Sequence, residues 1–362
     1  MRITMPHRRS IFFLLASLVP ASFLLAEEPA TVEIPVPTIA PIASPTDAFR
    51  FSVHWENDGT VLKPNGNTDR YYTNGAGFTL SWRNEFATQA TEWIPFPEKF
   101  DTIHRAVGFT SGQLMFTPAD ISINPPDPTD RPYAGYLYFG VFFQRSNEQT
   151  LDHIQLDIGL VGNSSLAENA QKIVHDVFNE PDPKGWDSQL EDEPTIQLTL
   201  RKKWRFDLGE VKLNDIPTIQ FQVIPEAELA VGTVHRYAKA GLLFRMGFQL
   251  PDDFGPDQLL HIGSFTGLGQ TQPWGGYLFT RISGKAVEHN LFLEGNTWKD
   301  SAGVDEEALV GEVQFGFGLQ FRKSENFIID VTYSQIYLTE EFENQDGSHG
   351  YGTLSLSFTW RF

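Results

Sequence analysis

Short segments in which apolar and polar residues alternate are the feature that most constrains how this chain can fold. Residues 353–362 place a large apolar side chain at every second position, from Leu354 to Phe362, with small polar residues or Arg361 between them. A period of two residues is that of a β-strand, and it gathers the apolar side chains on one face. Soluble sandwiches and membrane barrels share this pattern, so the segment predicts an all-β fold and leaves both architectures open.

Twelve segments carry the same signal: residues 49–57, 72–83, 105–117, 133–145, 150–162, 194–207, 216–232, 234–250, 274–288, 309–322, 327–339 and 350–362. An even number of strands is what a bacterial single-chain transmembrane barrel requires. The last segment ends on Trp360-Arg361-Phe362, and outer-membrane barrels commonly close with a strand whose final residue is aromatic. We therefore expect a twelve-stranded antiparallel transmembrane β-barrel over residues 49–362, with a short helix in an outer loop.

The N-terminal segment predicts the compartment. Basic residues from Arg2 to Arg9 precede an apolar stretch, residues 11–26, that ends in Ala26 before two glutamates, which is the pattern of a secretory signal peptide. A retained membrane anchor is disfavoured because the stretch is shorter than the ~20 residues that a spanning helix needs. Residues 27–48 are rich in proline and show no periodicity, which predicts a disordered periplasmic leader. We expect an outer-membrane protein of a Gram-negative bacterium after signal cleavage, with outer-membrane lipids and the barrel-assembly machinery as partners.

Composition excludes several classes of function. The chain has 27 basic and 46 acidic residues, a formal net charge of -19, so it should repel nucleic acids and other polyanions. An acidic surface suits divalent cations. The chain contains no cysteine, which rules out disulfide bonds, thiolate metal sites and thiol redox chemistry.

Strand parity predicts which links share a side of the membrane. If the first strand starts in the periplasm, the links after odd-numbered segments face outward. The inner links at residues 146–149 and 323–326 are short, as the rule of short inner turns expects. Two inner links, residues 84–104 and 251–273, are longer than this rule favours, and they are expected to contain extra helix or strand.

The first outer link and the strand after it supply two candidate site residues. Asp58 lies in Asn57-Asp58-Gly59, and Thr73 lies in the returning strand; both are expected on the lumen-facing register near the outer rim. The Asn-Asp-Gly run taken alone also suits an ordinary turn, because these residues tolerate turn dihedrals.

The third outer link predicts the short helix. Ser165 and Glu168 have the spacing of a capping box. An apolar stripe follows at helical spacing and is expected to dock the helix: Leu166, Ala170, Ile173, Val174, Val177 and Phe178. His175 lies opposite the stripe, on the same side as Gln171, so it should face the barrel mouth near Asp58 and Thr73. A single histidine on a polar helix face is otherwise most often solvated.

Several strings of residues resemble the LpxR-type lipid A 3'-O-deacylase family. They are Asn57-Asp58, Tyr72-Thr73-Asn74-Gly75, Asp130-Arg131-Pro132-Tyr133-Ala134-Gly135, the run from Asp157 to Gly162, the helix end from Ala170 to His175, and the run from Lys184 to Leu190. The similarity extends over residues 49–362. It implies a twelve-stranded outer-membrane barrel that uses Ca²⁺ to hydrolyse the ester of the 3'-linked acyloxyacyl chain of lipid A. It also implies that Asn57, Asp58, Thr73 and His175 occupy active-site positions.

Two positions depart from the family pattern. The family also uses a lysine from the second outer link, and residues 118–130 contain none; its place falls near Ile123 or Asn124. A glutamate expected shortly after the histidine is matched by Glu180, off register by one position. The missing lysine leaves open which ester is cut.

The candidate residues make chemical sense as an esterase. A neutral imidazole at His175 can act as general base on water near neutral pH, and Gln171, one turn earlier, is placed to orient the ring. Ca²⁺ prefers oxygen ligands, so Asp58, with Asn57, Thr73 and Glu180, is the expected metal set that polarises the ester carbonyl. The expected substrate is lipid A, the membrane anchor of lipopolysaccharide.

Two other classes of function remain. A serine esterase of the outer-membrane phospholipase type would need a serine beside His175, for which Ser164 and Ser165 are the nearest in sequence. A structural or pore-forming barrel would need none of these side chains.

Overall fold

Antiparallel strands make up nearly all of the regular structure in the computed structural model. It describes residues 47–59, 62, 69–92, 104–213, 216–256, 258–259 and 273–362, all within the unit Ala43–Phe362. The expected signal peptide and most of the expected leader lie outside the described residues. The strands are β1 (Ala48–Asn57), β2 (Tyr71–Arg83), β3 (His104–Thr117), β4 (Ala134–Ser146), β5 (Thr150–Val161), β6 (Glu193–Trp204), β7 (Phe206–Leu213), β8 (Ile216–Gly232), β9 (His235–Phe248), β10 (Trp274–Asn290), β11 (Leu309–Ser324), β12 (Phe327–Leu338) and β13 (His349–Arg361).

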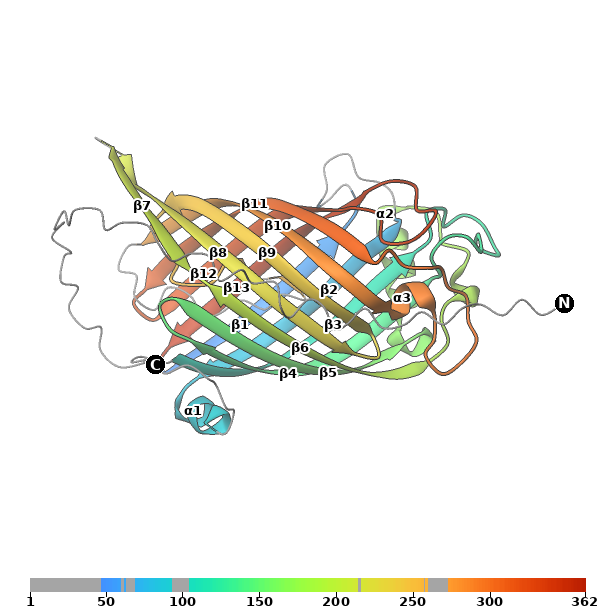
Figure 1. Ribbon diagram of the computed structural model, residues 1–362, viewed down its shortest axis with the longest axis horizontal. Helices are drawn as coiled ribbons and strands as arrows, with labels where there is room; N and C mark the ends of the chain where they lie inside the picture. Colours follow the sequence, from blue (N-terminus) through green and yellow to red (C-terminus); the bar gives the residue numbers. More distant parts are fainter. Residues whose placement is uncertain are drawn as a thin grey trace, which may run out of the picture. The chain divides into compact units, whose positions relative to one another are not determined.

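The sheet closes into a barrel through two pairings between strands far apart in sequence or order. β1 pairs with β13, and β6 pairs with the C-terminal part of β8. β7 pairs only with the N-terminal part of β8 and projects beyond the ring (Figure 1). Of thirteen strands, β7 is therefore outside the ring, and twelve antiparallel strands close the barrel, which confirms the predicted fold.

The predicted alternation sets the two faces of the wall. Large apolar side chains at alternate positions remain exposed on the outer surface, for example Phe109, Phe139 and Ile158. Exposed apolar residues in this number are unusual for a surface that meets water and typical of one that meets lipid. None of the helices in the described part of the chain is long and apolar enough to cross a membrane.

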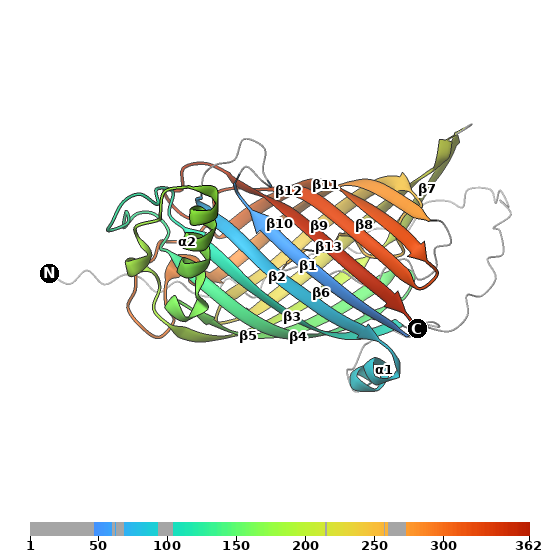
Figure 2. The same ribbon diagram turned by 180° about the vertical axis from the view of Figure 1, so that it is seen from behind.

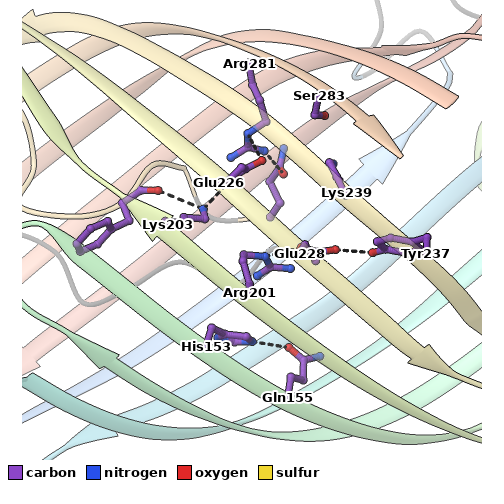
Figure 3. Close-up of polar contacts among 12 residues, drawn as sticks. His153, Gln155, Arg201, Lys203, Glu226, Glu228, Tyr237, Lys239, Arg281 and Ser283 are labelled. Carbon is purple, nitrogen blue, oxygen red and sulfur yellow. Dashed lines mark hydrogen bonds and ion pairs between the residues drawn. The ribbon is translucent and has the colours of Figure 1, made fainter. Parts of the chain in front are cut away.

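Polar residues at the other positions fill the lumen with ion pairs (Figure 3). Arg201 contacts Glu228 at 2.5 Å, while Glu226 contacts both Lys203 at 3.5 Å and Arg281 at 3.2 Å. These charges are buried in pairs, which limits the cost of removing each from water.

The long inner link after β9 folds back into the barrel. Asp253 pairs with the buried Arg245, and the carbonyl of Phe254 accepts a hydrogen bond from Lys203 at 3.1 Å. Further along, the backbone N–H of Leu259 donates to Glu56 at 3.4 Å, near the outer end of β1. The described part of this link, residues 249–256 and 258–259, thus plugs the lumen.

Helices mark the two ends of the barrel. The inner link after β2 contains α1 (Glu85–Thr91), an extra helix of the kind expected there, capped by Asn84. The outer links contain α2 (Ala167–Phe178), the short helices η1 (Asn163–Ser165) and η2 (Trp186–Ser188), and α3 (Leu291–Glu294). α2 and α3 lie at the end opposite α1 and the C-terminus (Figure 1). This arrangement agrees with the predicted parity of the links.

Candidate functional site

Helix α2 packs against the outer face of the barrel wall. Leu114 and Phe116 of β3 point into a lumen cluster, so Met115 between them points outward, where it contacts Ala167 and Trp186. The side-chain amide of Gln113 donates to the carbonyl of Ser165 at 2.6 Å. A Cβ at Gly135, which pairs with Met115, would lie 2.4 Å from the Cβ of Ala167.

The orientation of α2 is the reverse of the predicted one. The apolar stripe is exposed at Ile173, Val174 and Val177, whereas Gln171 and His175 are buried against the wall. The predicted docking of the apolar stripe is therefore wrong, as is the expected solvent-facing imidazole. The physical reason is that the wall beneath α2 accommodates the small Ala167, which packs on Met115, together with the polar Gln171 and His175, while the larger apolar side chains of the stripe face away from the wall.

The predicted capping box is also incomplete. Leu166 is the N-cap residue and has no side-chain cap hydrogen bond. The hydroxyl of Ser165 donates instead to the carbonyl of Gly162 at 2.6 Å, and Glu168 accepts from Lys172 at 2.6 Å. The Ser165 hydroxyl also accepts from the N–H of Ala167, the first residue of α2, at 3.4 Å, so only the Glu168 half of the capping box is missing.

His175 is held between a backbone carbonyl and a carboxyl group. Its Nδ1 lies 2.6 Å from the carbonyl oxygen of Pro181, and a carbonyl can only accept, so Nδ1 carries a proton. Its Nε2 faces Oδ2 of Asp69 at 3.1 Å. The ring is 2% exposed, so its orientation is set by these two contacts rather than by solvent.

Asp69 is the site residue that the sequence reasoning missed. It lies in the first outer link with a positive φ of 35°. Burial raises the pKa of the Asp69 carboxyl, the nearby His175 lowers it, and the negative charge of Glu180 raises it further. The only signal in the sequence was that Asp69 shares the first outer link with Asp58, and alternation says nothing about residues between strands.

Asp58 and Thr73 meet at the start of this link. The backbone N–H of Asp58 donates to the carbonyl of Thr73 at 3.3 Å, and its fully buried carboxylate accepts from the N–H of Arg70 at 2.9 Å. The amide of Asn57 donates to the same Thr73 carbonyl at 3.1 Å, and its Oδ1 accepts from Gly59 at 2.7 Å.

Thr73 does not face the lumen as expected. The register of β2 against β3 shifts between Tyr72 and Asn74, so Thr73 is an extra residue in a bulge. Its hydroxyl lies 2.7 Å from the hydroxyl of Thr117, which shares the outward face of β3 with Met115. The predicted lumen register is wrong because a bulge changes the face of a side chain that strict alternation assigns.

Asp69 and Arg70 join the predicted residues into one network. The Thr117 hydroxyl donates to the carbonyl of Asp69 at 2.7 Å, which links Thr73 to the residue that contacts His175. The backbone N–H of the next residue, Arg70, donates a hydrogen bond to the carboxylate of Asp58. Residues from β1, β2, β3 and α2 are thereby held together at the outer rim.

Two further predicted residues lie beside His175 but have other partners. Gln171 accepts a hydrogen bond from the indole of Trp186 at 2.7 Å, so it anchors α2 rather than contacting the imidazole. Glu180 groups with Asp69 and His175, with ligand atoms within 4.8 Å of one another, and not with Asp58.

The donor atoms fall into two sets that suit different cations. Asp58, Asn57 and Thr73 offer only oxygen, which fits Ca²⁺. Asp69, His175 and Glu180 offer an imidazole nitrogen with two carboxylates, a set that fits Zn²⁺-type ions better. The oxygen set therefore remains the better fit to Ca²⁺.

The third outer link places a lysine beside the second. The backbone N–H of Lys184 donates to the carbonyl of Ile121 at 2.9 Å, two residues before Ile123. The Lys184 side chain is exposed. A cation thus lies beside the loop where the family's lysine was expected and not found.

Comparisons with known proteins show the family and the fold of the chain. The chain matches the family described as "Outer membrane protein LpxR" over residues 11–360. Among solved structures it resembles LpxR from Salmonella typhimurium, with 18% identity, a TM-score of 0.61, and coverage of 87% of this chain and 100% of that one. The β domain of the Bordetella autotransporter BrkA matches at 8% identity and a TM-score of 0.40, covering 88% of this chain and 99% of that one. No curated protein matches the chain. The family match extends over nearly the whole barrel, and the chain therefore belongs to the LpxR family of outer membrane proteins.

Proposed function

We propose that this protein is a Ca²⁺-dependent carboxylic-ester hydrolase that removes the 3'-linked acyloxyacyl chain from lipid A in the outer leaflet. The family supports a lipid A deacylase type of activity at the outer membrane. The observation that carries the proposal is the network through Asp69 and Arg70, which joins His175 to Asp58 and Thr73 on the outward face of the wall. A site on that face meets lipid without extracting it from the membrane.

His175 is the general base in this proposal. The bond from Nδ1 to Pro181 leaves Nε2 as the atom that accepts a proton from water. Because Nε2 faces Asp69 at 3.1 Å, the attacking water enters beside this contact. Once Nε2 has taken the proton, the imidazolium lies between the Asp69 carboxylate and the Pro181 carbonyl, and both stabilise its charge.

The oxygen donors of Asp58, Asn57 and Thr73 would hold the metal. When bound there, Ca²⁺ supplies a positive centre that polarises the ester carbonyl and stabilises the oxyanion. Asp58 contributes the carboxylate of this set, and the Arg70 N–H fixes one of its oxygens. Lys184, beside the second outer link, offers a cation for an anionic headgroup in place of the lysine missing there.

The alternatives have less support. The hydroxyl of Ser164 donates to Asp192 at 2.5 Å and that of Ser165 to Gly162, while both ring nitrogens of His175 have other partners, so a serine nucleophile is disfavoured. A pore would need an open lumen. Among the described residues, ion pairs and the link after β9 occupy much of it, and a cavity of about 130 Å³ lies beside Glu56 and Glu312.

The test is acyl-chain release from lipid A in detergent across a Ca²⁺ titration, read by mass spectrometry. His175→Asn should lower the rate by roughly 10² to 10⁴ at every Ca²⁺ concentration, because metal cannot replace a base. Asp58→Ala should raise the Ca²⁺ requirement by about 10- to 100-fold and recover partly at high Ca²⁺.

Asp176→Ala, which removes an exposed carboxylate on the same helix, is the matched control and should behave as the parent. Heat-modifiable migration in electrophoresis checks that each barrel is folded. Full activity of the His175 variant would refute the role of His175 as general base. A parent protein whose activity does not depend on Ca²⁺ would refute the role of the metal.

A further inference from the structure

The exposed side of α2 divides into two chemically distinct sectors. At about 100° per residue, Ala167, Gln171 and His175 form the buried sector that faces the wall. Leu166, Ile173, Val174 and Val177 form an exposed apolar stripe on one flank. Lys172 and Asp176 form an exposed polar flank on the other, and Asn169 lies between this flank and the stripe. A helix that merely covered the wall in water would have no reason to separate its exposed residues in this way.

The side chains of the apolar stripe have no cover from the part of the chain that the structure describes. Val177 is 73% exposed and Ile173 is 64% exposed. Side chains of this kind in water are a liability unless an apolar phase covers them. The position of the stripe on the barrel indicates which phase that is.

The stripe continues the lipid-facing surface of the wall. On the outer face of β5, Leu156, Ile158 and Leu160 are exposed at alternate positions up to the end of the strand. Leu166 follows after η1 as the next exposed apolar side chain. Along the chain, the short turn at residues 162–165, in which Asn163 and Ser164 are exposed, is all that separates Leu160 from Leu166.

The direction of the helix fits this continuity. In Figure 2 the axis of α2 runs across the long axis of the barrel, so it is close to parallel to the membrane plane. With one sector against the wall, the apolar flank and the polar flank then lie on opposite sides, one toward the membrane and one toward the exterior. This is the arrangement of an interfacial amphipathic helix.

We propose that α2 is an interfacial helix whose apolar stripe lies among the acyl chains of outer-leaflet lipids. The proposal deepens the proposed function, on which its catalytic consequence rests. His175 lies on the same helix, so immersion of the stripe holds the imidazole at the depth where acyl chains join the headgroup, which is where an ester of lipid A lies.

Site-directed fluorescence tests the immersion without reference to catalysis. The chain contains no cysteine, so Val177→Cys, Ile173→Cys and Lys172→Cys each give a single labelling site for an NBD fluorophore. The barrels are reconstituted in phosphatidylcholine vesicles with nitroxide groups on the acyl chains. Quenching at the two stripe positions should exceed quenching at Lys172, the control on the polar flank, by about twofold or more.

Equal quenching at all three positions would overturn the proposal. If the stripe positions were shielded from water only when many barrels share a vesicle, a second copy of the chain rather than lipid would cover the stripe. That result would also overturn the proposal. Neither readout requires that the protein hydrolyse anything. A failure of the proposed function can therefore be distinguished from a failure of the proposed immersion of the helix.

A second measurement tests the catalytic consequence. The double variant Ile173→Asn with Val177→Asn should lower the rate on substrate embedded in vesicles by about tenfold and leave the rate on a short-chain ester in detergent unchanged. Asn169→Asp is the control and should change neither rate. An equal fall on both substrates would mean that the stripe has only a structural role, and no fall on vesicles would refute the orientation of the site by lipid.

Discussion

At the scale of single residues, the site depends on what surrounds one imidazole. The carbonyl of Pro181 accepts a hydrogen bond from Nδ1 of His175, and the carboxyl group of Asp69 lies beside Nε2, the atom that takes the proton in the proposed mechanism. Burial and the charge of Glu180 raise the pKa of Asp69, which means that its carboxylate forms at a higher pH than that of an ordinary aspartate. Activity that needs ionised Asp69 should therefore rise with pH through this raised pKa.

The pH profile of kcat/KM tests this role. Asp69→Asn should lower activity by about 10- to 100-fold and remove the rise that depends on Asp69 ionisation. Glu180→Gln removes the negative charge that raises the pKa of Asp69, so the rise should move to lower pH. Asp182→Asn, an exposed carboxylate two residues on, should leave the profile in place. A parent-like profile in the Asp69 variant would contradict the role.

At the scale of elements, the site requires α2 to lie directly on the wall. The close approach depends on Gly135, because a Cβ there would meet the hydroxyl of Ser165 at 2.1 Å and Ala167 at 2.4 Å, both short of van der Waals contact. The bulge at Thr73 brings its hydroxyl to the same face. The small Gly135 and the bulge at Thr73 thus position the helix that carries His175.

Gly135→Ala should displace α2 and lower hydrolysis by about tenfold or more while the barrel still forms, since the added methyl group meets side chains of Ser165 and Ala167 and not the backbone of β3 with which Gly135 pairs. Gly284→Ala is the matched control, because the nearest atom to its Cβ is a carbonyl 4.0 Å away. Hydrogen exchange of peptides from α2, compared with peptides from β4, would show the displacement. Unchanged exchange and activity in Gly135→Ala would mean that the helix tolerates the shift.

At the scale of the whole molecule, the barrel has a packed interior rather than a channel. The link after β9 adds Asp253 to the lumen network, where it pairs with the fully buried Arg245. Its neighbour Asp252 pairs with Arg205 but is half exposed. The two adjacent aspartates therefore differ mainly in how far their ion pairs are removed from water.

Asp253→Ala should destabilise the folded barrel by about 3–5 kcal/mol, because it leaves Arg245 buried without a carboxylate. Asp252→Ala should cost no more than about 1 kcal/mol, because water screens the exposed pair. Urea titrations followed by tryptophan fluorescence in detergent measure both. Similar midpoints for the two variants would argue against a plug held by the buried pair.

The sequence by itself determined the barrel, because alternation is a local property. In each strand, successive side chains point to opposite faces of the wall. Because one face meets lipid and the other meets a polar lumen, apolar and polar residues alternate along every strand. Strand number, link parity and the outer-end location of Asp58, Thr73 and His175 follow from counting. The apolar stripe of the α2 helix could also be recognised from the spacing of its residues, although its predicted docking was wrong.

Only the tertiary structure decided what each of these features faces. An amphipathic stripe suits contact with protein or with lipid. The spacing of Val177 and its neighbours therefore did not show which of the two they face, and the predicted docking of the stripe against the wall was wrong. The bulge at Thr73 moved its side chain off the face that strict alternation assigns. The contact between Asp69 and His175 joins two links that are distant in the chain, and such contacts exist only once the barrel closes and brings the ends of its strands together.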